Sequence, residues 1–147
     1  MKTPTAAAVV VDSYAWVEIF IGSGKGEKAK EAIQKAEEAY TPDIVLAEIA
    51  RKYMREGAKE NAIQQRLRTI EETTEITPID TETAIETTKC YIQLIEKAKK
   101  ENLKTPSLFD AIILATAKTL NAKLITGDQH FKDLSQTLWI GETRSYV

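Results

Sequence analysis

The feature that most constrains the fold is a run of consecutive apolar residues near the N-terminus, Ala8-Val9-Val10-Val11, which stops at Asp12. Three β-branched residues in succession favour a strand, and the lack of polar alternation is typical of a strand buried on both faces. Such strands belong to parallel sheets that helices cover on both sides. The opening of the chain therefore predicts an α/β protein.

Helical and strand patterns alternate along the rest of the chain. Helices are predicted over 14–20, 27–38, 42–56, 59–71, 81–101 and 106–120, and strands over 39–41, 75–79, 122–126 and 138–140. Two Thr-Pro pairs, Thr41-Pro42 and Thr105-Pro106, each predict a helix start with threonine as the N-cap and proline in the first turn. The alternation predicts a three-layer α/β/α sandwich on a mostly parallel sheet.

Apolar spacing predicts which face each amphipathic helix turns inward. Helix 59–71 carries Ile63, Leu67 and Ile70 on one side. For the long helix 81–101, the spacing predicts an inner face made of Ala84, Thr88, Tyr91, Ile95 and Ala98.

Length and composition exclude several classes of protein. The 147 residues predict a single domain over 1–147, and the net charge of −2 excludes a globally basic nucleic-acid binder but not a local basic patch. The only cysteine, Cys90, cannot form an intrachain disulfide or a cysteine-based zinc site. The apolar run from Ala6 to Val11 is too short for a signal peptide or a membrane span, so we expect a cytoplasmic protein without membrane attachment.

Four acidic residues stand in otherwise apolar surroundings. Asp12 and Asp128 each follow a predicted buried strand, and the carboxyl ends of parallel strands are where ligands bind in open sheets. Glu48 and Asp110 each lie inside an apolar helical stretch, where an unpaired charge is costly to bury. The four together indicate a functional site more strongly than any one of them alone.

Each acid also has a structural interpretation. Asp12 and Asp128 suit N-cap or turn positions, and Glu48 suits the exposed side of a half-buried helix. Asp110 falls in the first turns of its helix, where a negative charge complements the helix macrodipole. From the residues alone, the structural and functional interpretations remain open for each acid taken singly.

If the four carboxylates converge, their repulsion calls for a cation. Oxygen ligands without cysteine, and with His130 as the only histidine, favour Mg²⁺ or Mn²⁺ over zinc or copper. Ions held in this way suit phosphoryl chemistry, because they polarise a phosphate and activate a water molecule. Ser13 and Thr126 stand beside two of the acids, and their hydroxyls can support a carboxylate or an ion-bound water.

The order of these motifs resembles the PIN-domain ribonucleases, and within them the VapC-type toxins of prokaryotic toxin–antitoxin pairs. The resemblance extends from about Val9 to Gly141 and is carried by Val11-Asp12-Ser13, Leu46-Ala47-Glu48-Ile49, the block Phe109 to Ala117, and Ile125-Thr126-Gly127-Asp128-Gln129-His130-Phe131. The block that begins at Phe109 and the Thr-x-Asp-x-x-Phe block are its most specific parts.

The resemblance implies an α/β/α sandwich and a Mg²⁺- or Mn²⁺-dependent endoribonuclease that uses a metal-activated water. The catalytic, metal-binding acids of the family map onto Asp12, Glu48, Asp110 and Asp128, and the family's hydroxyl near the last acid maps onto Thr126. Many members carry a further acid near the third one, where this chain has Pro106-Ser107. The resemblance also implies an RNA substrate, a cognate antitoxin and a homodimer whose paired active sites share a groove.

Two further groups of residues suit binding partners. Arg51, Lys52 and Arg55 follow Glu48 on the same helix and can track an RNA backbone, although a solvated helical face explains each one singly. Tyr14, Trp16 and Phe20 crowd the first helix. The surface near Trp16 is therefore predicted to receive a second subunit or an antitoxin segment carrying Arg or Lys, with core packing as the alternative.

Other functions fit the sequence less well. The loop Gly22-Ser23-Gly24-Lys25-Gly26 lacks the first glycine and the final Ser or Thr of a phosphate-binding P-loop, so a surface turn is the better interpretation. His130 suits a solvated turn better than a catalytic role. A non-toxin RNA-processing nuclease, and a non-catalytic module that binds RNA or a partner, remain as alternatives to a toxin.

Overall fold

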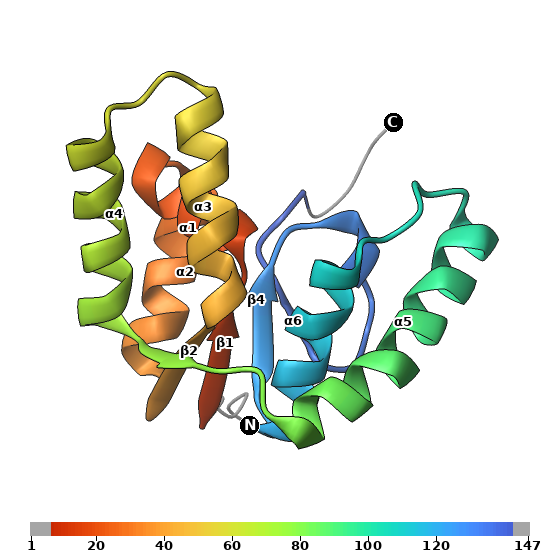
Figure 1. Ribbon diagram of the computed structural model, residues 1–147. Coiled ribbons are helices and arrows are strands. Elements are labelled where there is room, and N and C mark those ends of the chain that lie inside the picture. Colours follow the sequence, from red (N-terminus) through yellow and green to blue (C-terminus); the bar gives the residue numbers. More distant parts are fainter. Residues whose placement is uncertain (1–6, 143–147) are drawn as a thin grey trace.

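A computed structural model of the protein describes residues 7–142, so both ends of the predicted domain, 1–6 and 143–147, lie outside the described residues. Helices and strands alternate in the predicted order (Figure 1). In chain order they are β1 (Ala8–Val11), α1 (Ser13–Ile21), α2 (Gly24–Lys35), β2 (Glu38–Pro42), α3 (Asp43–Arg55), α4 (Glu60–Thr73), β3 (Glu75–Thr77), α5 (Thr81–Glu101), α6 (Leu108–Thr119), β4 (Lys123–Thr126), the short 3₁₀ helix η1 (Gln129–Phe131) and β5 (Thr137–Trp139).

The five strands form one parallel sheet in the order β3-β2-β1-β4-β5. β1 lies at its centre, where Val10 stands opposite Tyr40 of β2 on one side and Leu124 of β4 on the other. The chain builds outward from β1 to β3 and then returns to the other side of β1 to add β4 and β5. The carboxyl ends of β1 and β4 therefore meet where the direction of strand addition reverses, the usual place for a ligand site in such sheets.

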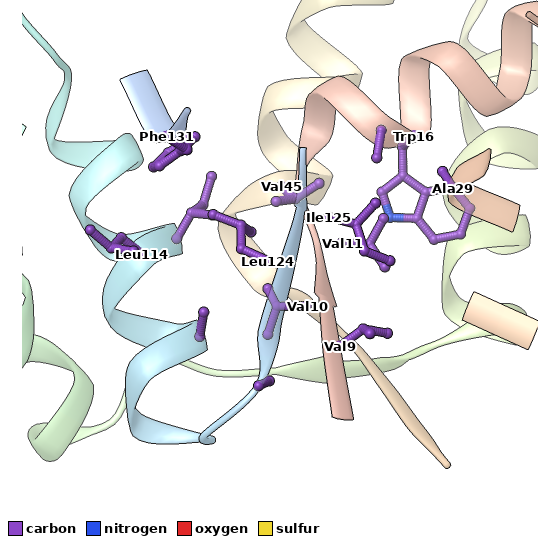
Figure 2. Packing of buried hydrophobic residues seen from close by; sticks show 14 of the residues in the cluster. Val9, Val10, Val11, Trp16, Ala29, Val45, Leu114, Leu124, Ile125 and Phe131 are labelled. Carbon is purple, nitrogen blue, oxygen red and sulfur yellow. The ribbon is translucent and has the colours of Figure 1, made fainter. Parts of the chain in front are cut away.

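Side chains of β1 alternate between two helical layers, which confirms the predicted sandwich. Val9 and Val11 point toward Trp16 of α1, whereas Val10 points toward the layer of α6, where Leu114 lies (Figure 2). Helix α2 packs along α1, α5 packs along α6, and α4 pairs with α3. All three valines are fully buried, as the uninterrupted apolar run predicts.

The second helix is placed differently from the prediction of 27–38. It begins inside the glycine loop at Gly24, because the Ser23 hydroxyl caps it by accepting a hydrogen bond from the Gly26 N–H at 3.1 Å. It ends at Lys35, and Glu38 belongs to β2, where it pairs with Ala8 of β1. Cap chemistry and strand pairing thus override the helical propensity of the charged residues near the end of the segment.

The predicted helix starts at the two Thr-Pro pairs are also displaced. Thr41 is buried and does not cap α3; its hydroxyl accepts a hydrogen bond from the Trp16 indole at 3.1 Å and shares another with Thr74 at 2.6 Å. Helix α3 begins one residue after Pro42, without a side-chain cap. Helix α6 is capped by Ser107 instead of Thr105.

Helix α5 turns a different face inward from the one predicted. Its buried residues are Thr83, Thr87, Cys90, Leu94 and Ala98, so the inner face is displaced by one position from the predicted one along most of the helix. Threonine is tolerated inside because the hydroxyl of Thr87 donates to the Thr83 carbonyl at 2.7 Å, which leaves no unpaired polar group. The exposed face consequently carries Ile85 and Ile92, which are 58% and 61% exposed.

Trp16 is a core residue, so core packing, the alternative interpretation of this side chain, is correct. Its side chain is 1% exposed, stacks on Phe20 with ring centroids 5.8 Å apart, and donates to Thr41 from inside the core. The tryptophan fills the space between α1 and the sheet, so it is not available to a partner. Within residues 7–142, no helix is both long and apolar enough to cross a membrane.

Candidate active site

All four predicted acids line one open cleft of about 710 Å³ at the carboxyl edge of the sheet. Asp12 follows β1 and Asp128 follows β4, the two strands whose ends meet at the reversal of strand order, and the β4 arrow in Figure 1 points toward this edge. Glu48 and Asp110 reach the cleft from α3 and α6. We call this the acidic cleft; it is lined by Asp12, Ser13, Tyr14, Val17, Glu18, Glu48, Ile49, Arg51, Lys52, Arg55, Glu56, Asp110 and Asp128.

Asp12 is the most deeply placed of the four acids. It is 3% exposed, and both carboxylate oxygens are engaged: Oδ1 accepts from the Ser13 N–H at 2.7 Å, and Oδ2 accepts from the Thr126 hydroxyl at 2.7 Å. Asp12 is also the N-cap of α1, so the structural interpretation of this residue is correct. The cap holds the carboxylate at the start of the helix, and the helix position brings it to the cleft.

Thr126 connects two of the acids from beneath the cleft. Its fully buried hydroxyl donates to Asp12 and accepts a hydrogen bond from the Asp128 N–H at 3.0 Å. The Thr126 side chain therefore fixes the position of the Asp12 carboxylate and of the Asp128 backbone.

Asp110 and Ser107 form a capping box at the start of α6. The Asp110 carboxylate accepts from the Ser107 N–H at 2.9 Å, and the Ser107 hydroxyl accepts from the Asp110 N–H at 3.1 Å. Oδ2 makes the first of these contacts, and Oδ1 takes no part in the box. The helix-terminus interpretation of Asp110 is thus correct, and it coexists with the position of the residue in the cleft.

Asp128 is held by its neighbour His130. The carboxylate oxygen Oδ1 accepts from the His130 N–H at 2.8 Å and lies 2.9 Å from the ring nitrogen Nδ1. The other ring nitrogen, Nε2, lies 2.8 Å from the Lys104 carbonyl oxygen. The histidine is therefore not the solvated turn residue that the sequence predicts. The contact with Lys104 could not be predicted, because 26 positions separate the two residues.

Glu48 differs from the other acids because it caps nothing. It lies in the second turn of α3, and its carboxylate oxygen Oε1 is buried without a hydrogen-bond partner in the described part of the chain. A buried carboxylate oxygen without a donor is costly, and such groups call for an explanation such as an ion. The predicted exposed-face alternative for Glu48 does not fit this burial.

Burial and mutual repulsion raise the proton affinity of the acids. Burial raises the pKa of Asp12 to about 7, helped by the charges of Asp128 and Glu48 and opposed by the hydrogen bond from Thr126. Burial also raises the pKa of Glu48 to about 7, together with the charge of Asp110. The pKa of Asp110 is raised by burial and by the charge of Asp128. Each of these carboxylates thus interacts unfavourably with at least one of the others.

Three basic residues of α3 line the cleft together with the acids. Arg51, Lys52 and Arg55 all line the acidic cleft, as expected for residues that follow Glu48 at helical spacing. Lys52 is engaged in an ion pair with Glu56 at 2.6 Å, whereas the positive charge of Arg51 lowers the pKa of Glu48. The lining of the cleft therefore combines the four predicted acidic residues with three basic residues of α3.

The donor set suits a hard divalent cation. Carboxylate oxygens are the ligands that Mg²⁺ and Mn²⁺ prefer. A cation would give the unpartnered Glu48 oxygen a partner, and its positive charge would lower the raised pKa values of Asp12 and Glu48. Within residues 7–142, no three acidic, histidine or cysteine side chains stand close enough together to hold an ion without adjustment.

Tyr14 is a cleft residue whose role the sequence does not predict. Its ring lies against Gly127, where a Cβ atom would come within 2.4 Å of ring carbon Cε1, and its hydroxyl lies 3.2 Å from Nζ of Lys25. The glycine between Thr126 and Asp128 is thus required for close packing of the tyrosine. The sequence identifies Tyr14 only as one of three aromatic residues on α1.

Parallel strands covered on both faces, with four acids gathered where the strand order reverses, define the class of protein. The family model for the PIN domain matches residues 9–136, and the chain belongs to this family. This confirms the family predicted from the blocks around Asp110 and Asp128. Among curated proteins, the sequence finds no match.

Solved structures with this fold include bacterial toxin–antitoxin proteins. A chain of a toxin–antitoxin complex from Klebsiella pneumoniae has a TM-score of 0.66 at 25% identity, covering 91% of this chain and 98% of that one. A chain of VapBC2 from Rickettsia felis has a TM-score of 0.63 at 18% identity, covering 90% and 96%. VapC20 from Mycobacterium tuberculosis, a sarcin–ricin loop cleaving toxin, has a TM-score of 0.60 at 16% identity, covering 84% and 92%. The chain is thus a PIN domain of the VapC type in its fold.

Proposed function

We propose that this protein is a Mg²⁺- or Mn²⁺-dependent endoribonuclease and the toxin of a toxin–antitoxin pair. The observation that carries the proposal is the acidic cleft itself, whose lining includes Asp12, Glu48, Asp110 and Asp128 together with basic residues of α3. Four mutually repelling carboxylates are costly to bring together without a cation. A cleft lined by both acidic and basic residues suits a polyanionic substrate, because the basic groups can bind its backbone while the acids would hold an ion at the reacting phosphate.

Asp12, Glu48, Asp110 and Asp128 would hold the ion, which supplies polarisation of the phosphate and activation of a water molecule. The protein's own contribution is to orient these acids. The Asp12 carboxylate is set by Ser13 and Thr126, and that of Asp110 by its capping box. Arg51, Lys52 and Arg55 would bind the RNA backbone near the reacting phosphate.

The cleavage reaction can be tested with the full chain and a fluorescent RNA that contains single-stranded and hairpin segments. We expect cleavage with Mg²⁺ or Mn²⁺ and none with EDTA, and loss of cleavage in Asp110→Asn. Asp80→Asn is the matched control, because the Asp80 carboxylate, like that of Asp110, accepts a backbone hydrogen bond at a helix start but lies outside the acidic cleft. Equal RNA binding with and without metal, and no cleavage under any condition, would favour a non-catalytic binding module instead.

The toxin role rests on the likeness to the Klebsiella pneumoniae complex and on the charge of the cleft. A basic side chain from an antitoxin segment would neutralise the carboxylates, so inhibition and metal binding should compete. We expect expression of the wild-type protein, but not of Asp110→Asn, to arrest growth of a bacterial host. Cleavage in vitro without growth arrest would favour an RNA-processing nuclease over a toxin.

We also propose that the protein forms a homodimer through α5. Ile85 and Ile92 lie seven residues apart on the same exposed face of the helix, and a second copy of the chain would cover these two large apolar side chains. We expect a dimer mass by light scattering at micromolar concentration, and a monomer mass for Ile85→Glu/Ile92→Glu. A wild-type monomer at that concentration would contradict the dimer.

A further inference from the structure

We propose that His130 is a positioning residue that holds the carboxylate of Asp128 in place for the acidic cleft. The proposal rests on the nuclease function proposed above, and it assigns a role to the only histidine of the chain. Asp128 needs such support because it follows β4 in a turn, outside the long helices that carry Glu48 and Asp110.

The geometry of the histidine ring carries the inference. Nδ1 lies 2.9 Å from Oδ1 of Asp128, and Nε2 lies 2.8 Å from the carbonyl oxygen of Lys104. A carbonyl oxygen can only accept a hydrogen bond, so Nε2 is a donor in this arrangement. With both nitrogens directed at fixed acceptors and the side chain only 18% exposed, neither nitrogen is left to exchange a proton with a substrate. His130 therefore acts through Asp128 and not on the RNA.

The bridge joins two segments that are distant in the sequence. Lys104 belongs to the connection between α5 and α6, and Lys97 of α5 makes a second contact with the same turn by donating to the Gln129 carbonyl at 3.3 Å. The turn that carries Asp128 is thus attached to α5 and its connection at two points. Removing the ring would leave the carboxylate held only by the His130 N–H, while the backbone bond from Asp128 to Thr126 remains.

The arrangement follows a general rule for metal sites. Residues that hydrogen-bond to a ligating carboxylate fix its orientation, and their loss lowers metal affinity or activity by about 10–100-fold. One oxygen of Asp128, Oδ1, takes both contacts from His130, so Oδ2 remains for the cleft. His130 would therefore determine which oxygen is offered to an ion and in which direction.

Two conservative variants separate the two contacts of the ring. The amide nitrogen of Asn reaches the place of Nδ1, so His130→Asn keeps the contact with Asp128. The longer Gln side chain reaches the place of Nε2, so His130→Gln keeps only the contact with Lys104. Lys123→Ala is the matched control, because Lys123 donates to the Ser135 carbonyl at 2.7 Å at the amino end of β4, outside the acidic cleft.

The experiment measures Mn²⁺ affinity by isothermal titration calorimetry on the full-length protein, and kcat and KM for RNA cleavage separately. We expect His130→Ala to weaken Mn²⁺ binding about 10-fold or more and to lower kcat, with KM for RNA unchanged. His130→Asn should recover most of the Mn²⁺ affinity, and His130→Gln should not. Thermal unfolding of all variants shows whether each one is folded, and Lys123→Ala should match the wild type in Mn²⁺ affinity and kcat.

The outcomes separate this inference from the proposed function. Wild-type Mn²⁺ affinity in His130→Ala, or equal recovery by Asn and Gln, would overturn the positioning role even in an active nuclease. A wild-type protein that binds Mn²⁺ but cleaves no RNA would end the nuclease proposal, and the Mn²⁺ affinities of the variants would still decide the role of His130. A wild-type protein that binds no Mn²⁺ would overturn both.

Discussion

The hydroxyl of Thr126 donates to the Asp12 carboxylate at 2.7 Å and so joins two residues that are 114 positions apart in the chain. The contact exists because β1 and β4 are neighbours in the sheet, with Val11 opposite Ile125 and the Asp12 N–H donating to the Ile125 carbonyl at 3.2 Å. The strand pairing therefore sets the position of the first acid, and the acidic cleft forms only when the sheet is complete.

Replacing Asp12 with asparagine should stabilise the metal-free protein above neutral pH. Burial raises the pKa of Asp12 from 3.8 to about 7, so ionising it in the folded state opposes folding. At about 1.4 kcal/mol per pKa unit, the charge costs up to about 4 kcal/mol. Asparagine keeps one acceptor oxygen but carries no charge, so the variant should recover part of this cost, about 1–3 kcal/mol.

This change can be measured by urea unfolding at pH 8 in EDTA. Asp80→Asn is the control, because hydrogen bonds from Thr83 lower the pKa of Asp80 and its charge therefore favours folding. The control should leave stability unchanged or slightly reduced. Destabilisation of the protein by Asp12→Asn would show that the buried carboxylate is not the strained group that its surroundings indicate.

Without metal, the stability of the protein should fall as the pH rises from about 5 to 7. The pKa of Asp12 and that of Glu48 are about 7 in the folded protein and near 4 in the unfolded chain, so the folded state binds more protons throughout this range. The raised pKa values of Asp110 and His130 act in the same direction. The free energy of unfolding should therefore decrease with pH and level off above about 7.

Urea titrations between pH 5 and 8 in EDTA check this sign, and Asp12→Asn should flatten the slope. Addition of Mg²⁺ should stabilise the protein more at pH 8 than at pH 5.5, because protons and the ion compete for the same carboxylates. Stability that increases with pH in EDTA would contradict the assigned pKa directions.

Replacing Arg55 with alanine should raise KM for RNA and leave kcat unchanged. Arg55 lines the acidic cleft at the last turn of α3, and a phosphate contact contributes to binding without taking part in the reaction. Loss of one contact to single-stranded RNA should make the slope of log K against log [KCl] shallower by about 0.7, where K is the RNA-binding constant. Binding measured across a series of KCl concentrations tests this, with the exposed Lys35→Ala at the end of α2 as the control. An unchanged slope would exclude Arg55 from the interface.

The packing of α1 on α2 makes Gly26 intolerant of any side chain. A Cβ atom there would lie 2.2 Å from the Glu18 carbonyl oxygen and 2.9 Å from the Ile19 Cα, both backbone atoms that cannot move aside. We expect Gly26→Ala to destabilise the protein by about 2–4 kcal/mol through overpacking. Gly24→Ala, in the same helix with no atom within 4 Å of its added Cβ, should be neutral or stabilising by about 0.5–1 kcal/mol. Similar stability of the two variants would contradict the close contact of the helices.

Local signals in the sequence predicted much of the fold and all four acids of the cleft. The uninterrupted run Val9–Val11 is apolar because both faces of β1 are covered, so a two-sided sheet follows from three adjacent residues. Asp12 and Asp128 stood out because each follows such a strand, and Glu48 because a charge within an apolar helix has a cost. These are properties of a residue and its immediate neighbours, and a sequence displays them directly.

Contacts between distant segments decided what the sequence did not. Local spacing placed the inner face of α5 one residue away from its true position, because packing against α6 decides which residues are buried. Threonine can be among them, since its hydroxyl donates a hydrogen bond to a carbonyl of the same helix. Thr41 was predicted as a cap because its sequence suits one, but the Trp16 indole requires its hydroxyl in the core. The bridge from His130 to Lys104 likewise exists only in the folded chain. Sequence alone thus determined the layers and the chemical character of the cleft, whereas tertiary structure decided the orientation of its groups, because directional hydrogen bonds depend on partners that only folding brings within reach.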